Sequence, residues 1–264
     1  MKAIEKAAYL AHSKTKGYLN RLDRTRDLIS KHPGYCSSVS WGKDSVAMLH
    51  LATQTLGEHR AINARYPNHN ERFRDMDEVR DALLNRDDMR TINYQEVDTP
   101  GEWEMYEREG GGGFLTAETK KQREVCRWWK DNFVSNLEAA SLSMGANGHF
   151  VGLCAEESRG RRMCLYVHGQ SYERADGMKI ALPMGWWSAK DIWAYHVVNN
   201  LPSLIIYDLS AEGRCRARSG FVFSTTGTEN TLPRHGVWKE WERIYPNEFN
   251  EWIAAFPRLI EGVL

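Results

Sequence analysis

Six consecutive residues near the start of the chain have the types and spacing needed to bind an anion: Ser40, Trp41, Gly42, Lys43, Asp44 and Ser45. They follow a short predicted strand and precede a partly helical apolar pattern, so they form a turn between a strand and a helix. The first N–H groups of a helix lack intrahelical acceptors and carry partial positive charge, which favours a phosphate. Gly42 allows close backbone approach, Lys43 adds a full positive charge, and Asp44 can cap the helix or bind Mg²⁺.

Two later groups of residues carry concentrated charge. Glu157, Ser158 and Arg161 follow another predicted strand, and Arg216 and Arg218 lie in an arginine-rich stretch near the C-terminal end. Charges of this density are costly to bury unpaired, so they indicate a ligand, with a solvated turn of salt bridges as the alternative for the first group. Guanidinium groups bind phosphate or sulfate through two parallel hydrogen bonds, and a nucleic-acid backbone is a further ligand that suits the second group.

The pattern of apolar residues predicts the elements that position these groups. Residues 3–30 predict one or two helices with a break at Gly17, and the helix after the anion-binding turn ends near Thr55. Strands are then expected over 60–66 and 91–97, separated by a charged helix over 71–85. This alternation indicates a doubly wound α/β fold with a mainly parallel sheet, whose ligands bind at the carboxyl ends of the strands. Asn63 is therefore expected on the same rim as the turn.

Three segments are expected along the chain: a helical N-terminal segment over 1–30, an α/β domain over 31–210 that contains the anion-binding turn, and an arginine-rich segment with a helical C-terminal extension over 211–264. Aromatic residues at helical spacing in this extension predict either core packing or a homodimer face. The four glycines Gly110–Gly113 predict either a mobile lid or a plain solvent loop.

Composition narrows the class of protein. Lys plus Arg and Asp plus Glu both total 35, so no overall charge favours nucleic acid or membrane. No apolar run reaches the length of a membrane span, and the N-terminus has no signal-peptide pattern, so we expect a cytoplasmic protein without a membrane partner. The five cysteines include no C-x-x-C pair, so we expect neither a zinc knuckle nor an iron–sulfur cluster.

The turn resembles the S-G-G-x-D-S pyrophosphate loop (PP-loop) of the adenine nucleotide alpha-hydrolase superfamily, in the branch of phosphoadenosine phosphosulfate (PAPS) reductases and ATP sulfurylase small subunits. Trp41 replaces the first glycine of that loop. Gly152, Glu157, Ser158 and Arg161 match the motif G-x-R-x-x-E-S-x-x-R of this branch, with Cys154 in the place of its first arginine.

Three further segments extend the resemblance. The segment 183–195 is similar to P-L-x-x-W-[ST]-x-x-D-[VI]-W-x-Y, and Cys126 and Lys130 match a Cys-x-x-x-Lys segment. The arginines at 214–218 resemble the arginine-rich segment of ATP sulfurylase small subunits. Within 183–195, Ser188 and Asp191 have the spacing of a capping box, which indicates an architectural role.

The resemblance implies a HUP-like fold, an adenine nucleotide, ATP or PAPS, bound through its phosphates, and Mg²⁺ as a cofactor held by Asp44. ATP cleavage between the alpha- and beta-phosphates would adenylate an acceptor or prime sulfur transfer, and the sequence leaves the acceptor or sulfur carrier open. Ser40 and Ser45 would hold the leaving pyrophosphate. The groups offsetting the phosphate charge would be Lys43, Arg161, Arg216 and Arg218.

Two alternatives stay open. A PAPS reductase uses a cysteine in a Glu-Cys-Gly-[LI]-His motif near its C-terminus, and the last cysteine in this sequence is Cys215. Thiol-dependent sulfite release would therefore need Cys215 or Cys154 as the nucleophile. The second alternative is a nucleic-acid-directed sulfur-modification protein or a nucleotide sensor without turnover, with the arginine clusters binding phosphate.

Overall fold

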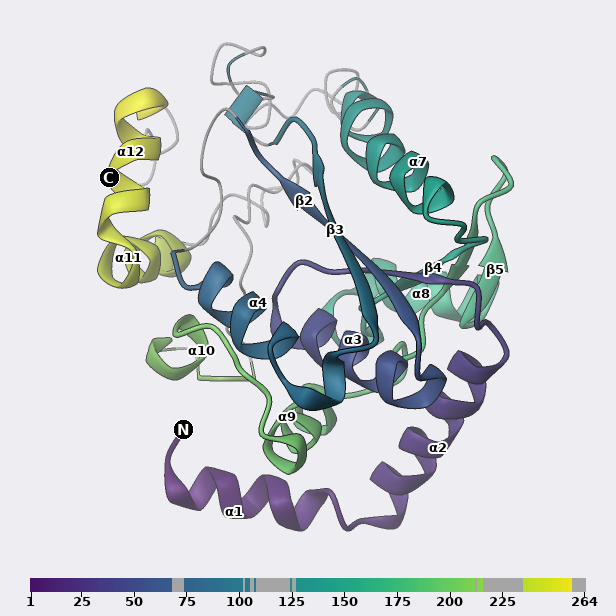
Figure 1. Ribbon diagram of the computed structural model, residues 1–264. Coiled ribbons are helices and arrows are strands. Elements are labelled where there is room, and N and C mark those ends of the chain that lie inside the picture. Colours follow the sequence, from purple (N-terminus) through teal and green to yellow (C-terminus); the bar gives the residue numbers. More distant parts are fainter. Residues whose placement is uncertain are drawn as a thin grey trace.

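The centre of the computed structural model is a six-stranded sheet with the strand order β3-β2-β1-β4-β6-β5 (Figure 1). The structure describes residues 1–67, 74–101, 103–104, 107, 124, 127–211, 213–215 and 235–257. The strands are β1 (Cys36–Ser38), β2 (His59–Arg65), β3 (Ile92–Asp98), β4 (His149–Val151), β5 (Ser171–Glu173) and β6 (Lys179–Ala181). All neighbouring strands are parallel except β5 and β6, which pair antiparallel at one edge. The predicted mainly parallel α/β sheet is confirmed.

Helices cover both faces of the sheet (Figure 1). Helix α3 packs on the face to which Ala61 and Phe150 belong, and α7 packs on the opposite face, with Cys36 and Ile62. The α-helices are α1 (Ala3–His12), α2 (Lys16–Ser30), α3 (Lys43–Leu56), α4 (Met76–Leu84), α7 (Ser135–Ser143), α8 (Arg159–His168), α9 (Ala189–Asn199), α10 (Ile206–Leu209), α11 (His235–Ile244) and α12 (Pro246–Ala255). Shorter helical turns are η1 (Asp87–Met89), η3 (Lys130–Val134, a π-helix) and η4 (Ala155–Glu157). The fold is therefore doubly wound.

The order of the strands defines where a ligand can bind. The chain runs outward from β1 through β2 to β3, then returns to form β4 on the other side of β1. Ser38 at the end of β1 is in register with Val151 at the end of β4. The loops that follow these two strands therefore start side by side, at the switch point where open α/β sheets bind ligands.

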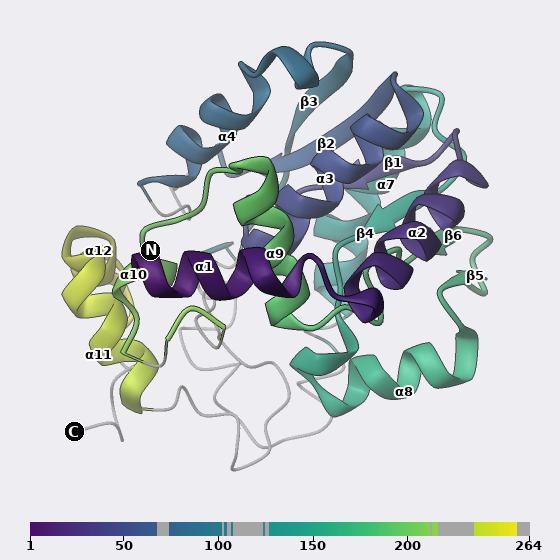
Figure 2. The ribbon, with the colours of Figure 1, turned by 90° about the horizontal axis from the view of Figure 1, so that it is seen from below.

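Asp191 holds the two N-terminal helices against α9, across which α1 lies in Figure 2. Its carboxylate is 1% exposed and accepts hydrogen bonds from Arg21 Nη2 at 2.7 Å and His12 Nε2 at 2.8 Å. Ser188 and Asp191 also form the predicted capping box. Burial favours the neutral acid, but the hydrogen bonds from Arg21, Ser188 and His12 keep the pKa of Asp191 below its usual value. The break between α1 and α2 lies at 13–15, so the break predicted at Gly17 is wrong, because Gly17 fits in the first turn of α2.

The C-terminal helices α11 and α12 pack together at one end of the molecule (Figure 2). Five aromatic side chains of this segment lie in the interior: Trp241, Tyr245, Phe249, Trp252 and Phe256 are each at most 9% exposed. Trp103 contacts both Trp252 and Phe256 edge to face. These rings are therefore core residues of this chain, and a homodimer through the same segment stays a prediction.

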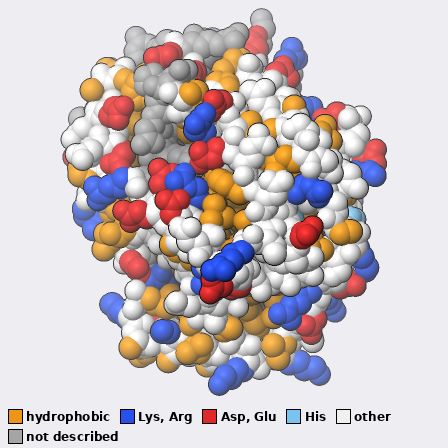
Figure 3. Space-filling model, viewed as in Figure 1, with side chains coloured by type: hydrophobic (Ala, Val, Ile, Leu, Met, Phe, Trp, Pro, Cys, Tyr) orange, Lys and Arg blue, Asp and Glu red, His pale blue; other side chains and the backbone are white. Residues whose placement is uncertain are grey.

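Charged side chains of both signs are interspersed on the face shown in Figure 3, in keeping with the balanced composition. Within the described ranges, no helix is both long and apolar enough to cross a membrane. The predicted lid at Gly110–Gly113 lies outside the described residues, as does Cys126. Lys130 is described, and its ammonium pairs with Asp176 at 3.1 Å.

Two buried histidines begin β2 and β4, the strands on either side of β1, and are hydrogen-bonded to serines. His59 Nε2 is 2.7 Å from Ser37 Oγ, and His149 contacts Ser38 Oγ through Nδ1 and Ser141 Oγ through Nε2. Burial lowers the pKa of both His59 and His149 to about 4, so both are neutral at pH 7. The polar positions of β1 are thus satisfied inside the core.

These histidines predict a loss of stability in mild acid. The unfolded chain takes up protons near the ordinary histidine pKa, while the folded chain does so only near pH 4. The free energy of unfolding should therefore have its full value above about pH 7. It should fall by about 3 kcal/mol per histidine as the pH drops from about 6.5 to 4. Urea unfolding across this range measures it, and His149→Asn should flatten the dependence. The exposed His168→Asn is the control, and an unchanged slope in His149→Asn would contradict this account.

Candidate functional site

The loop after β1 folds back on the first turn of helix α3. Ser45 Oγ donates to the carbonyl of Gly42 at 3.0 Å and accepts the N–H of Ser40 at 3.2 Å. The two hydroxyl oxygens of Ser40 and Ser45 are 3.3 Å apart. Helix α3 begins at Lys43, so the N–H groups of its first turn lack intrahelical acceptors. The loop therefore joins two hydroxyls and a helix N-terminus, which is the chemistry of a phosphate site.

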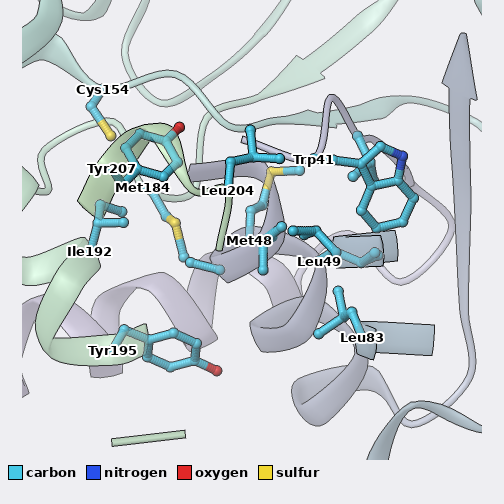
Figure 4. Packing of buried hydrophobic residues seen from close by; sticks show 14 of the residues in the cluster. Trp41, Met48, Leu49, Leu83, Cys154, Met184, Ile192, Tyr195, Leu204 and Tyr207 are labelled. Atoms are coloured by element: carbon cyan, nitrogen blue, oxygen red, sulfur yellow. The ribbon is translucent and has the colours of Figure 1, made fainter. Parts of the chain in front are cut away.

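Trp41 adopts the left-handed conformation that a glycine would adopt without strain. Its φ is +58°, a region that costs a non-glycine residue about 1–2 kcal/mol. The indole is 1% exposed and packs edge to face on Tyr94, with ring centroids 5.6 Å apart. In Figure 4 the ring lies on the side of Leu49 and Leu83, away from Cys154. Burial of the indole thus offsets the backbone strain, and the packed Trp41 side chain anchors the loop to the core.

Two residues hold the peptide groups on both sides of Lys43. The N–H of Lys43 donates to Tyr207 Oη at 3.1 Å, and the carbonyl of Lys43 accepts from His196 Nε2 at 2.7 Å. Burial lowers the pKa of His196 to about 4, so the neutral ring donates this hydrogen bond at pH 7. Only the tertiary structure shows that Tyr207 and His196 fix the loop.

Arg214 connects the arginine-rich stretch to the same contacts. Its guanidinium lies 4.6 Å from the centre of the Trp193 ring and pairs with Asp208. Trp193 in turn packs against His196 and Tyr207. Arg214 is 6% exposed, so it is a core residue that brings the start of this stretch close to the loop. The predicted phosphate ligands Arg216 and Arg218 lie outside the described residues.

Four charged side chains of opposite sign meet beside the loop. Lys43 Nζ is 2.5 Å from Asp44 Oδ2 and 3.7 Å from Glu157 Oε1, and Arg161 pairs with Glu157. Burial lowers the pKa of Lys43, but the attraction of Asp44 and Tyr207 outweighs it, so the pKa is raised and the ammonium stays charged. The structure thus joins the residues predicted from the first two clusters into one site. The cluster carries no net charge.

The turn after β4 approaches the loop through Gly152. A Cβ atom on Gly152 would lie 3.2 Å from the backbone N and Cα of Ser45, closer than ordinary contacts. Farther along, Ser158 is the N-cap of α8 and its hydroxyl accepts the N–H of Arg161 at 3.1 Å. Gly152 therefore allows close approach, and Ser158 starts the helix that presents Arg161.

Cys154 faces the loop from the position where the resemblance expects an arginine. Its side chain is 2% exposed, and the thiol donates to Asp44 Oδ1 at 3.6 Å. Burial and the nearby Asp44 carboxylate raise the pKa of Cys154 well above its ordinary value. The structure therefore favours a protonated structural thiol over a nucleophile at this position.

Asn63 supports the loop from the neighbouring strand. Its side-chain amide donates to the carbonyl of Val39 at 2.5 Å, and the residue is 6% exposed. The structure thus places Asn63 at the predicted rim, with its amide on the loop backbone.

A single carboxylate in the loop fits Mg²⁺ that is bound together with a nucleotide. Mg²⁺ usually takes one or two carboxylates and completes its shell with water and phosphate oxygens. Asp44 would supply one carboxylate oxygen, with Glu157 close by across Lys43. Among the described residues, no three His, Cys, Asp or Glu side chains are grouped to hold a metal ion by themselves. Metal binding at this site would therefore depend on the phosphates.

The sheet order, the loop at the switch point and the motif after β4 define a protein of the adenine nucleotide alpha-hydrolase superfamily. Residues 34–231 match the family model of the phosphoadenosine phosphosulfate reductase domain, so the chain belongs to this family.

Among the solved structures that resemble the chain, two examples have low sequence identity to it. One is the PAPS reductase from Candida auris in a phosphate complex, with 14% identity, a TM-score of 0.49, and coverage of 76% of this chain and 90% of that one. The other is the NMN synthetase from Francisella tularensis, with 15% identity, a TM-score of 0.43, and coverage of 70% of each chain. No curated protein sequence matches the chain.

The two cysteines proposed as alternative nucleophiles should differ in reactivity. Cys215 is exposed, with its sulfur 3.5 Å from Tyr9 Oη, whereas Cys154 is buried and its thiolate is disfavoured. Iodoacetamide at about pH 8 should label Cys215 in the native protein and Cys154 only after unfolding in urea. Peptide mapping by mass spectrometry separates the sites, and Cys154→Ser is the control for assignment. Rapid native labelling of Cys154 would restore it as a nucleophile.

Proposed function

We propose that this chain binds ATP with Mg²⁺ and cleaves it between the alpha- and beta-phosphates, releasing pyrophosphate and transferring the adenylyl group or priming sulfur transfer. The proposal rests on family membership and on one observation, which is that two carboxylates lie beside the lysine of the phosphate loop. The nucleotide phosphates are assigned to the loop over residues 40–45 and the first turn of α3.

The paired acids favour a metal-bound nucleotide over free PAPS. Asp44 and Glu157 together cancel the charges of Lys43 and Arg161, so a further anion would meet no net attraction from these four side chains. A divalent cation that enters with the nucleotide removes this conflict, because it binds the carboxylate and the phosphates together. When bound, Mg²⁺ would supply charge neutralisation at the phosphate oxygens.

The residues of the loop have distinct roles in this proposal. Ser40 and Ser45 donate through their hydroxyls to the pyrophosphate that leaves. Lys43 carries a full positive charge on its side chain, and its backbone is fixed by Tyr207 and His196. The raised pKa of Lys43 keeps that charge present at neutral pH. Arg161 is half-buried and contacts phosphate from the β4 side. Most of the catalytic effect then comes from charge placed before the reaction begins.

Thiol-dependent reduction of PAPS is the less supported alternative. Cys154 is buried against Asp44, and its thiolate is disfavoured there. Cys215 is exposed and would be the nucleophile of this alternative. Thioredoxin-dependent sulfite release that a Cys215→Ser change abolishes would favour reduction over ATP cleavage.

Lys43 gives the first test of ATP cleavage. Lys43→Ala should lower ATP-dependent pyrophosphate release by about 100-fold or more, because a preorganised charge at the phosphates is lost. Lys179→Ala is the matched control, since Lys179 is exposed at the start of β6, at the end of the parallel strands opposite to the loop. A coupled pyrophosphate assay with Mg²⁺ and candidate acceptors measures the rate, and circular dichroism checks the fold. Pyrophosphate release by Lys43→Ala at the parent rate would refute the proposal.

Gly152 tests the position of the loop without removing a charge. Gly152→Ala should weaken Mg·ATP binding roughly tenfold, because its methyl group displaces the backbone of Ser45 by a few tenths of an ångström. Gly160→Ala is the control, since its Cβ would meet its nearest neighbour only at 4.0 Å. Calorimetric titration with ATP, with and without Mg²⁺, gives both affinities. Equal affinities in the two variants would place the phosphates elsewhere.

A further inference from the structure

Helix α8 presents an exposed apolar face directly after the candidate site. Met163, Tyr166 and Val167 of this helix are 52%, 69% and 67% exposed, and the neighbouring Trp186 is 41% exposed. The rings of Tyr166 and Trp186 meet at 59° with centroids 5.1 Å apart. Because the rings are tilted and not stacked, neither covers the flat face of the other. Large apolar side chains grouped on a surface in this way indicate a binding site.

Two exposed arginines continue this face toward the candidate site. Arg159 and Arg162 are exposed, and within the described part of the chain no ion pair involves either of them. Arg159, Arg162 and Tyr166 are three and four residues apart, so they form one stripe along the helix. The stripe runs over about 10 Å at the usual helical rise.

The arginines lie at the end of the helix that least favours them. Arg159, Arg161 and Arg162 are in the first turns of α8, where the helix dipole is positive, and the first turn contains no acidic residue. Of these three arginines, Arg161 alone has an ion pair among the described residues, with Glu157, and the nearby Glu156 accepts from the N–H of Ala189. A bound anion would relieve this unfavourable arrangement.

The first turn of α8, where the stripe begins, lies beside the proposed ATP site. Arg161 of this turn pairs with Glu157, whose carboxylate is 3.7 Å from Lys43. Figure 2 shows α8 at the edge of the molecule, on the side away from α11 and α12.

We propose that this face of α8, defined by Arg159, Arg162, Met163, Tyr166, Val167 and Trp186, binds a single-stranded nucleic acid. The arginines contact backbone phosphates, and the rings of Tyr166 and Trp186 stack on unpaired bases, which is the combination such proteins use. The chain has no net charge, so the attraction depends on this local group. This inference rests on the proposed function, in which the nucleic acid would be the acceptor that receives the activated group.

The test is binding of a fluorescein-labelled single-stranded oligonucleotide of mixed sequence to the full chain, followed by fluorescence anisotropy at about 50 mM salt and at increasing salt. Tyr166→Ala and Trp186→Ala should each weaken binding by about 5- to 100-fold, whereas Tyr166→Phe should bind like the parent because the stacking ring is kept. Arg162→Ala should lower the slope of log affinity against log salt by about 0.7. Arg24→Ala, at an exposed position on α2, is the control for charge.

Three results would overturn the inference. The first is no binding of the oligonucleotide at low salt. The second is binding that Tyr166→Ala and Trp186→Ala leave unchanged, which would show a charge effect without stacking. The third is a concentration-dependent dimer in sedimentation that Tyr166→Ala dissociates, which would make this face a contact between copies of the chain.

Titration of the same variants with Mg·ATP separates this inference from the proposed function. Tyr166→Ala and Arg162→Ala should bind Mg·ATP as the parent does, because neither residue contacts the phosphate loop. Oligonucleotide binding without ATP binding would refute only the proposed function. ATP cleavage without oligonucleotide binding would refute only the role of α8.

Discussion

The structure depends on the peptide of Lys43 being held from both sides. Tyr207 accepts its N–H and His196 donates to its carbonyl, so the start of α3 is fixed to α9 and α10. Trp193 packs on both residues, and Arg214 lies over Trp193. Segments that are far apart in the sequence therefore share one rigid contact. An anion-binding loop needs this rigidity, since its N–H groups must point at the ligand before it arrives.

The two departures from the family pattern have physical explanations in the packing. Trp41 occupies a left-handed backbone position where glycine is usual, and the burial of its indole against Tyr94 offsets the strain. Cys154 replaces a guanidinium with a protonated thiol on Asp44. The second departure leaves the site with one positive charge fewer than the family pattern gives it. This loss is part of the reason that we propose a metal-bound nucleotide for the site, and not a bare anion.

Much of the fold follows from local patterns in the sequence. The alternation of apolar strands and amphipathic helices predicts the parallel sheet, and the position of the loop between a strand and a helix predicts the helix N-terminus. The antiparallel pair of three-residue strands β5 and β6 is not among the predicted elements. The break predicted at Gly17 is misplaced by a few residues, because glycine is tolerated in the first turn of a helix.

The sequence by itself determined the chemistry available at the site: the hydroxyls, the lysine, the acids and the arginines, in the order of a known family. Only the tertiary structure decided how they are used. It pairs Lys43 with Asp44 and Glu157, buries Cys154 and turns Asn63 to the loop backbone. It also leaves Tyr166 exposed. These outcomes depend on the register of β1 with β4 and on the packing of α9, which bring together residues more than a hundred positions apart.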